Sequence, residues 1–236
     1  DFFMETSTVM KSDISFLDED LLKQYFKNKG IELNEENKEF LLESSRIAYR
    51  EKESGKMNCT LGGLLIFSNY NSLWIPQNMI KIINRINKNK DEVIVIQGSI
   101  LEMVDKSERV IYDLMPNDYP SSAIIEGVKN AVLYRKYSSV NRVIEISIGY
   151  KSVSINSPGA LIEKSNLGKE ISHSKRNIWI YEKLITLDNN KRFLNNGRGF
   201  SRMKKAFYGV GKVKLINSIK DDYFKVILPG VSIYDK

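Results

Sequence analysis

The sequence predicts an α+β fold: a two-layer sandwich with a mostly antiparallel sheet and helices on one face, preceded by a small helical or α+β subdomain. Three observations carry this prediction. Residues 143–155 alternate apolar and polar side chains and turn at "GYK", which is typical of a β-hairpin. Residues 212–230 form a second hairpin pattern with two aspartates at its turn. Helical periodicity occupies the stretches before and between the hairpins.

The N-terminal part begins with residues 1–15, which show no periodicity and are predicted to be a tail or linker. A helix follows, with Asp18 as its N-cap and Gly30 as its C-terminal stop. A second helix is predicted to start at Asn34. Its buried face is predicted to carry three apolar residues, Phe40, Leu41 and Ile47.

The next segment leads to a predicted subdomain boundary after residue 115. "TLGGLLIFSN" indicates a buried element, whereas "MIKIINRI" fits either a helix or a strand. "EVIVIQGS" is typical of a strand that ends at Gly98, and a helix follows through "ILEMVDKSERVIYDLM". We therefore expect a tail over 1–15, a subdomain over 16–115 and a second domain over 116–236.

The predicted second domain opens with a helix that has Pro120 in its first turn. One face of that helix carries a stripe of apolar residues: Ile124, Ile125, Val128, Ala131 and Val132. "RNIWIYEKLITL" predicts another helix, and "NGRGFSRMKKAF" a glycine loop that opens a further one.

Composition restricts the classes of function. Hydrophobic residues make up 42% and charged residues 28% of the 236, a globular balance without any membrane-spanning run or signal-peptide pattern. A single cysteine, Cys59, excludes an internal disulfide and fits a reducing cytoplasm, and together with the single His173 it argues against zinc and Ser-His-Asp chemistry. The net charge of +7 fits phosphate or nucleic-acid contact, or simply a lysine-rich chain.

Two patterns contain candidate functional residues. Glu126 and Asn130 lie four residues apart on the face opposite the apolar stripe, where a carboxylate can orient water and an amide oxygen can ligate Mg²⁺. A solvated helix face is the alternative. In "NGRGFSRM", Gly197 and Gly199 flank Arg198 before a helix, an arrangement that brings phosphate to backbone N–H groups, or that serves as an ordinary connector.

The order of four motifs resembles a known family. The chain reads "YPSSAIIEGVKNAVLYRKYS", then "SVSINSPGAL", then "RNIW", then "NGRGFSRM", with "TLGGLLIF" and "VIQGSILEMVDKS" upstream. These stretches resemble the ATP-binding C-terminal region of the divergent Alba/Schlafen-like transcriptional regulators, some of which are labelled RecG-related helicases. The resemblance covers the chain from about Asp13 to its end. It implies a divergent GHKL-type (Bergerat-like) nucleotide-binding sandwich.

The resemblance also implies roles for individual residues. Glu126 matches the family's catalytic glutamate, and Asn130 its Mg²⁺-ligating asparagine. The matches on the nucleotide-binding side are Asn156 and Gly159 in the loop beneath the adenine, Arg176 and Asn177, and the phosphate loop with Gly197, Arg198 and Gly199. The family's N-terminal Alba-like domain has no counterpart, and the chain begins at Asp1, so we expect a fragment or a processed chain.

The chain departs from the family where His-Arg-Asp-Tyr is replaced by Tyr134 to Tyr137, which places Lys136 where the family has an aspartate. Lys136 is expected either to contact phosphate or to mark a site without hydrolysis. The first hypothesis is a cytoplasmic, homo-oligomeric ATP- and Mg²⁺-binding module that switches a DNA-binding regulator, with slow or absent hydrolysis. The alternative is a degenerate, non-enzymatic scaffold whose basic surface binds DNA or a partner protein. No Walker-type phosphate loop is present in the sequence, so a helicase motor is rejected.

Overall fold

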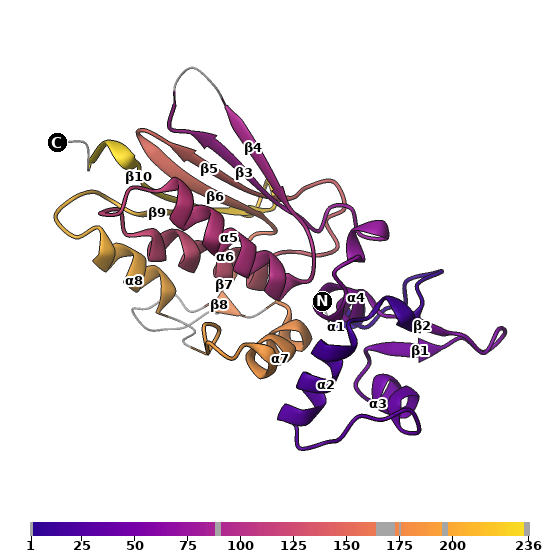
Figure 1. Cartoon of the computed structure of the whole chain (residues 1–236). Coiled ribbons are helices and arrows are strands. Elements are labelled where there is room, and N and C mark those ends of the chain that lie inside the picture. The colour runs from indigo at the N-terminus through magenta and orange to yellow at the C-terminus, as the bar shows by residue number, and fades with distance from the viewer. Residues whose placement is uncertain (1, 88–90, 164–172, 175, 195–197, 234–236) are drawn as a thin grey trace. The chain divides into compact units, whose positions relative to one another are not determined.

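The structure is a computed structural model that describes residues 2–87, 91–163, 173–174, 176–194 and 198–233 (Figure 1). The chain divides into two compact units. Unit 1 comprises residues 1–78, 97–102 and 177–194, and unit 2 comprises residues 79–96, 103–176 and 195–236. This division differs from the predicted boundary after residue 115, because the strands over 80–96 and most of the helix that follows them belong to the second unit.

Unit 1 is built mainly from helices. Its elements are α1 (Phe2–Glu5), η1 (Ile14–Phe16), α2 (Glu19–Asn28), α3 (Lys38–Ser44), β1 (Ala48–Arg50), β2 (Met57–Cys59), α4 (Leu61–Phe67), η2 (Asn71–Leu73) and α7 (Ile178–Leu187). The predicted start of α2 is confirmed, because the Asp18 side chain accepts hydrogen bonds from the backbone N–H groups of Asp20 and Leu21. All seven residues of α4 are buried, as its apolar sequence predicts.

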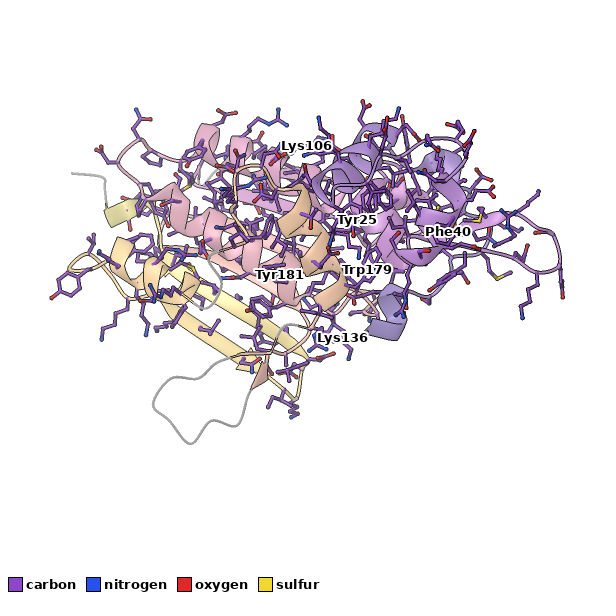
Figure 2. The ribbon with its side chains drawn as sticks, turned by 90° about the horizontal axis from the view of Figure 1, so that it is seen from below. Tyr25, Phe40, Lys106, Lys136, Trp179 and Tyr181 are labelled. Atoms are coloured by element: carbon purple, nitrogen blue, oxygen red, sulfur yellow. The ribbon has the colours of Figure 1, made fainter. Side chains whose placement is uncertain are left out.

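Two predictions for unit 1 differ from the structure. The first fifteen residues were expected to be a tail, but Glu5 and Ser12 are each only 1% exposed and Thr8 bridges to Thr60. Phe40 was expected on a buried face, yet its side chain is 71% exposed (Figure 2). The helix was also expected to start at Asn34, but the Asn34 side chain accepts from two backbone N–H groups in a turn and α3 begins at Lys38. The buried residue of α3 is Leu42; Leu41 is half-buried, and Ile47 is buried but lies after the helix.

Among the described residues of unit 2, six strands form one sheet in the order β4-β3-β5-β6-β10-β9. The strands are β3 (Ile80–Arg85), β4 (Glu92–Ile96), β5 (Ile144–Gly149), β6 (Ser152–Pro158), β9 (Lys214–Ser218) and β10 (Tyr223–Pro229). Only the β3–β5 pairing within this sheet is parallel. Both predicted hairpins are confirmed, and the segment "MIKIINRI" contains the strand β3 rather than a helix.

The helices of unit 2 form the second layer. They are α5 (Ile100–Leu114, whose first residues belong to unit 1), α6 (Ser121–Tyr134) and α8 (Gly199–Ala206), and the remaining elements are β7 (Ile162–Glu163), β8 (His173–Ser174) and η3 (Val231–Ile233). Figure 1 shows α5, α6 and α8 on the same face of the sheet. The alternating apolar residues of β5, β6 and β10 are buried, so the predicted α+β layering, with its mostly antiparallel sheet, is confirmed.

Candidate functional site

A cluster of charged side chains in unit 2 lies between α6 and α8. The Glu126 side chain is only 11% exposed, and both of its oxygens are engaged. Its Oε2 lies 2.6 Å from the Nζ of Lys129 one turn further along α6, and its Oε1 lies 2.7 Å from an Nη of Arg202 on α8. The alternative of a solvated helix face therefore does not hold at Glu126, because α8 covers that part of α6.

A glycine occupies the first position of α8, close to the side chains of Glu126 and Asn130. A Cβ at Gly199 would overlap the Oε1 of Glu126 and lie 3.0 Å from the Nδ2 of Asn130. A larger residue would therefore require the Glu126 and Asn130 side chains to move. The structure thus brings together three residues that the sequence predicted as one site, Glu126, Asn130 and Gly199. It adds Lys129, which the sequence analysis did not assign.

This α6/α8 cluster favours an anion. Lys129 and Arg202 contribute two positive charges against the single negative charge of Glu126, so the cluster as a whole is cationic. The N-terminus of α8 starts at the same place, and the first backbone N–H groups of a helix attract negative charge. Arg198, the residue before α8, is exposed beside it. A phosphate-bearing ligand matches this charge distribution.

The same cluster fits a divalent cation poorly on its own. Mg²⁺ prefers oxygen ligands, carboxylates above all, and keeps several waters or phosphate oxygens in its shell. Glu126 already binds two cationic side chains, which leaves the amide oxygen of Asn130 as the protein's contribution. The described residues contain no group of three or more His, Cys, Asp or Glu side chains suited to a metal ion. Mg²⁺ would have to arrive with the phosphates.

A second cluster surrounds the loop that was predicted to lie beneath adenine. Gly159 has a φ of +97°, and a Cβ there would lie 2.6 Å from the Cβ of Lys136. The Lys136 Nζ lies 2.8 Å from a carboxylate oxygen of Asp222, whose other oxygen accepts from the backbone N–H of Ala160 at 3.1 Å. The hydrogen bond from Lys136 holds the pKa of Asp222 below its usual range.

Arg176 belongs to this loop cluster as well. An Nη of Arg176 donates to the backbone carbonyl of Ala160 at 2.6 Å. Burial lowers the pKa of the Arg176 guanidinium, an effect that the negative charge of Asp222 partly offsets. Three of the predicted residues, Lys136, Gly159 and Arg176, are therefore gathered by Asp222 into a hydrogen-bonded cluster. Lys136 contacts a carboxylate there.

Asn156 lies elsewhere. Its neighbours in β6 face α6: the Ser157 hydroxyl donates to the carbonyl of Ala131 at 2.9 Å, and the Ile155 side chain packs against Gly127. Since successive residues of a strand point to opposite faces, Asn156 lies on the face of the sheet away from α6 and Glu126. Its cross-strand neighbours there are Glu145 and Lys225.

The other predicted nucleotide-site residues do not all lie in unit 2. Asn177 belongs to unit 1, where it precedes α7, whereas Arg176 belongs to unit 2. Gly197 lies outside the described residues.

Sequence reasoning missed Lys129 and Asp222 as members of these clusters. A local signal exists for Lys129, because residues three apart on a helix are neighbours and Glu126 is its partner. For Asp222 there is no such signal, since 86 residues separate it from Lys136.

Unit 2 defines the class of structure: an α+β protein with a mostly antiparallel six-stranded sheet among the described residues, covered by helices on one face. A bilayer-spanning helix is absent from the described residues, because no helix there combines sufficient length with apolar character. No family model matches the sequence, and no curated protein matches it either.

A solved structure with a similar fold is that of the DIP2311 protein from Corynebacterium diphtheriae. The two are 18% identical with a TM-score of 0.59, and the match covers 97% of this chain and 47% of that one. The chain thus spans about half the length of that protein. At this level of identity the likeness supports the fold alone.

Proposed function

We propose that unit 2 is a GHKL-like nucleotide-binding module of a DNA-binding transcriptional regulator, in which ATP acts as a conformational or dimerisation switch. The observation that carries this proposal is the meeting of Glu126 and Asn130 on α6 with Gly199 at the start of α8. These are residues of two separate motifs, and the resemblance assigns both motifs to one nucleotide site. Their proximity is what such a site requires.

In this proposal the phosphates bind at the N-terminus of α8. Backbone N–H groups there, with Arg198 and Arg202, supply positive charge on one side, and Lys129 supplies it from α6. The amide oxygen of Asn130 coordinates the Mg²⁺ that accompanies the phosphates. The adenine lies toward the Gly159 loop, and Asn156, on the opposite face of the sheet, takes no part.

Hydrolysis is not expected from this arrangement. A glutamate that positions the attacking water needs a free carboxylate oxygen, and both oxygens of Glu126 are bound by cationic side chains. The family's histidine and aspartate are replaced by Tyr134 and Lys136, and Lys136 is paired with Asp222. We therefore propose that Glu126 orients Lys129 and Arg202 toward the phosphates and that nucleotide is bound without turnover.

Titration calorimetry with ATP and Mg²⁺ tests the proposal. The wild-type chain is expected to bind ATP, and Asn130→Ala to weaken binding by at least tenfold because Mg²⁺ loses its protein ligand. Asn156→Ala is the matched control: the same change in side chain, on the far face of the sheet, is expected to leave the affinity within about twofold. Absence of binding by the wild-type chain at millimolar ATP would contradict the proposal.

A degenerate scaffold is the second candidate, and the engaged state of Glu126 favours it. If the Glu126 pairs serve only to join α6 to α8, then Arg202→Ala lowers stability without any effect of ATP on the wild-type unfolding curve. If the pairs serve the ligand, ATP raises the unfolding midpoint of the wild-type chain, and Arg202→Ala reduces that increase. Thermal unfolding with and without nucleotide distinguishes the two.

A further inference from the structure

A basic surface lies on α8 and the turn after it. The sequence from 198 to 214 contains six Lys or Arg residues and no Asp or Glu. We define the α8 basic surface by four exposed residues, Lys204, Lys205, Tyr208 and Lys212. Tyr208 is 89% exposed, so its ring is open to solvent.

The geometry of α8 separates this surface from the proposed nucleotide site. Met203 and Phe207 point into the core of unit 2, with exposed fractions of 1% and 0%, and the Phe207 ring packs edge-on against Tyr119 at 5.5 Å. Arg202 points toward Glu126. Both lysines are exposed: at 100° per residue Lys204 lies nearly opposite Arg202, and Lys205 lies opposite the buried face of Met203 and Phe207.

The turn after α8 fixes the position of Tyr208. Its backbone N–H donates to the carbonyl of Lys205 at 3.2 Å, and the N–H of Gly211 donates to the carbonyl of Phe207 at 3.1 Å. These hydrogen bonds hold the backbone of Tyr208 in a turn that directly follows Lys205. Within the described part of the chain, none of the three lysines of the surface forms an ion pair with an acidic side chain.

We propose that the α8 basic surface binds single-stranded nucleic acid. Its lysines would neutralise consecutive phosphates, and the exposed Tyr208 ring would stack on an unpaired base. Charge complementarity supplies the phosphate contacts, and the exposed ring favours a single strand, because paired bases of a duplex have no free face to stack on. This surface does not use the nucleotide site and stands independently of it.

The burial pattern of α8 argues against an anionic membrane as the occupant. A helix that binds a lipid surface inserts its apolar face between headgroups. Met203 of α8 and Phe207 at its C-cap are instead part of the protein core, and Phe200 of α8 is half-buried. The exposed side chains here are mainly lysines and the Tyr208 ring, with Val210 44% exposed in the turn; charge beside an exposed ring is the combination typical of single-strand binding.

Fluorescence anisotropy with a labelled oligonucleotide of about 20 nucleotides tests the proposal. Three lysine–phosphate contacts on a single strand give a slope of about 2 in a plot of log affinity against log salt, so affinity is expected to fall about 20-fold from about 50 to 200 mM salt. Lys204→Gln with Lys205→Gln should leave only about a 3-fold fall. Tyr208→Ala should weaken binding by roughly tenfold with the slope unchanged.

Lys52→Gln with Lys56→Gln is the matched control, because it removes the same charge from two exposed lysines of unit 1. This control is expected to bind like the wild-type chain. Equal losses in both double variants would reduce the effect to net charge and overturn the proposal. Tighter binding to the matching duplex, or binding to anionic vesicles but not to the oligonucleotide, would overturn it as well. Asn130→Ala is expected to bind the oligonucleotide normally, so failure of the nucleotide proposal would leave this one standing.

Discussion

Two charged clusters, one in each unit, differ in their exposure. The cluster of unit 1 is enclosed: Glu5 is 1% exposed, and the Lys183 Nζ lies 4.0 Å from the centre of the Trp179 ring while pairing with Glu182 at 2.8 Å. Unit 2 places its cluster at the edge of the α6/α8 contact, where the Arg202 side chain remains 41% exposed. Charges enclosed in a core serve folding, whereas charges that border solvent can also meet a ligand.

The chemistry of the unit 1 charges agrees with this difference. Burial raises the pKa of Glu5 to about 7, although backbone N–H groups of α7 and the charge of Lys183 act in the opposite direction. Burial likewise lowers the pKa of Lys183, while its partner Glu182 acts to raise it. Loss of water disfavours the charged forms of both Glu5 and Lys183. This desolvation penalty is expected of ionisable groups that are buried in a protein core.

The largest expected effect is in the core of unit 1. Trp179→Ala removes a side chain that is 6% exposed and leaves a cavity beside Lys183, so the free energy of unfolding should fall by about 3–5 kcal/mol. Urea unfolding followed by circular dichroism measures it. Figure 2 labels Trp179 and also Phe40, which is used for the control variant.

Phe40→Ala is the matched control in the same unit. Because the Phe40 side chain is 71% exposed, its removal should change the free energy of unfolding by no more than about 0.5 kcal/mol. Similar losses in the two variants would show that Phe40 is covered in solution, and the contrast between a sealed and an open region would then need revision.

A smaller effect is expected from Glu5, and it depends on pH. Its pKa is about 7 in the folded chain and 4.5 in the absence of burial, so the folded state holds the proton longer. The free energy of unfolding therefore falls as pH rises from about 4.5 to about 7, by roughly 3 kcal/mol, and Glu5→Gln should abolish this fall. Urea unfolding curves between pH 4.5 and 8 measure it.

Asp13→Asn provides the control for that titration. A hydrogen bond from the Ser15 backbone N–H lowers the pKa of Asp13, so this carboxylate stabilises the fold above its ordinary pKa of 3.8 and loses the effect only as pH falls further. The Asn variant should keep the fall between pH 4.5 and 7. If it lost that fall while Glu5→Gln retained it, Glu5 would not be the group that titrates.

Much of the fold was predictable because its signals are local. The alternation of Ile144, Glu145 and Ile146 predicts a strand, and the period of α6 predicts its apolar stripe. The parallel pairing of β3 with β5 was not predictable, because it joins residues about 64 apart in sequence, such as Ile80 and Ile144. Such pairings depend on how the whole chain folds back, which periodicity does not encode.

The candidate site divides in the same way. The order of the motifs placed Glu126, Asn130 and Gly199 together, and the structure brings these three residues close to one another. The engaged state of Glu126 was only half predictable: Lys129 is a neighbour on the same helix, but Arg202 lies 76 residues away. Asn156 was assigned from a loop motif, and the strand register, rather than the motif, decides which way it faces.

The smallest expected effect on the free energy of unfolding concerns Lys136, a partly exposed residue of unit 2. Its side chain and that of Asp222 are each more than a third exposed, so Lys136→Met, which keeps the packing stem beside Gly159, should cost only about 0.5–1 kcal/mol near pH 7. Because the folded pKa of Asp222 lies below its ordinary value of 3.8, this cost should disappear as pH falls below 3.8 and through the folded pKa. Lys220→Met, at an exposed position before the same aspartate, should show no such dependence. A cost that disappears in acid would assign Lys136 to holding the loop. Unchanged stability with weaker ATP binding would assign it to the ligand instead.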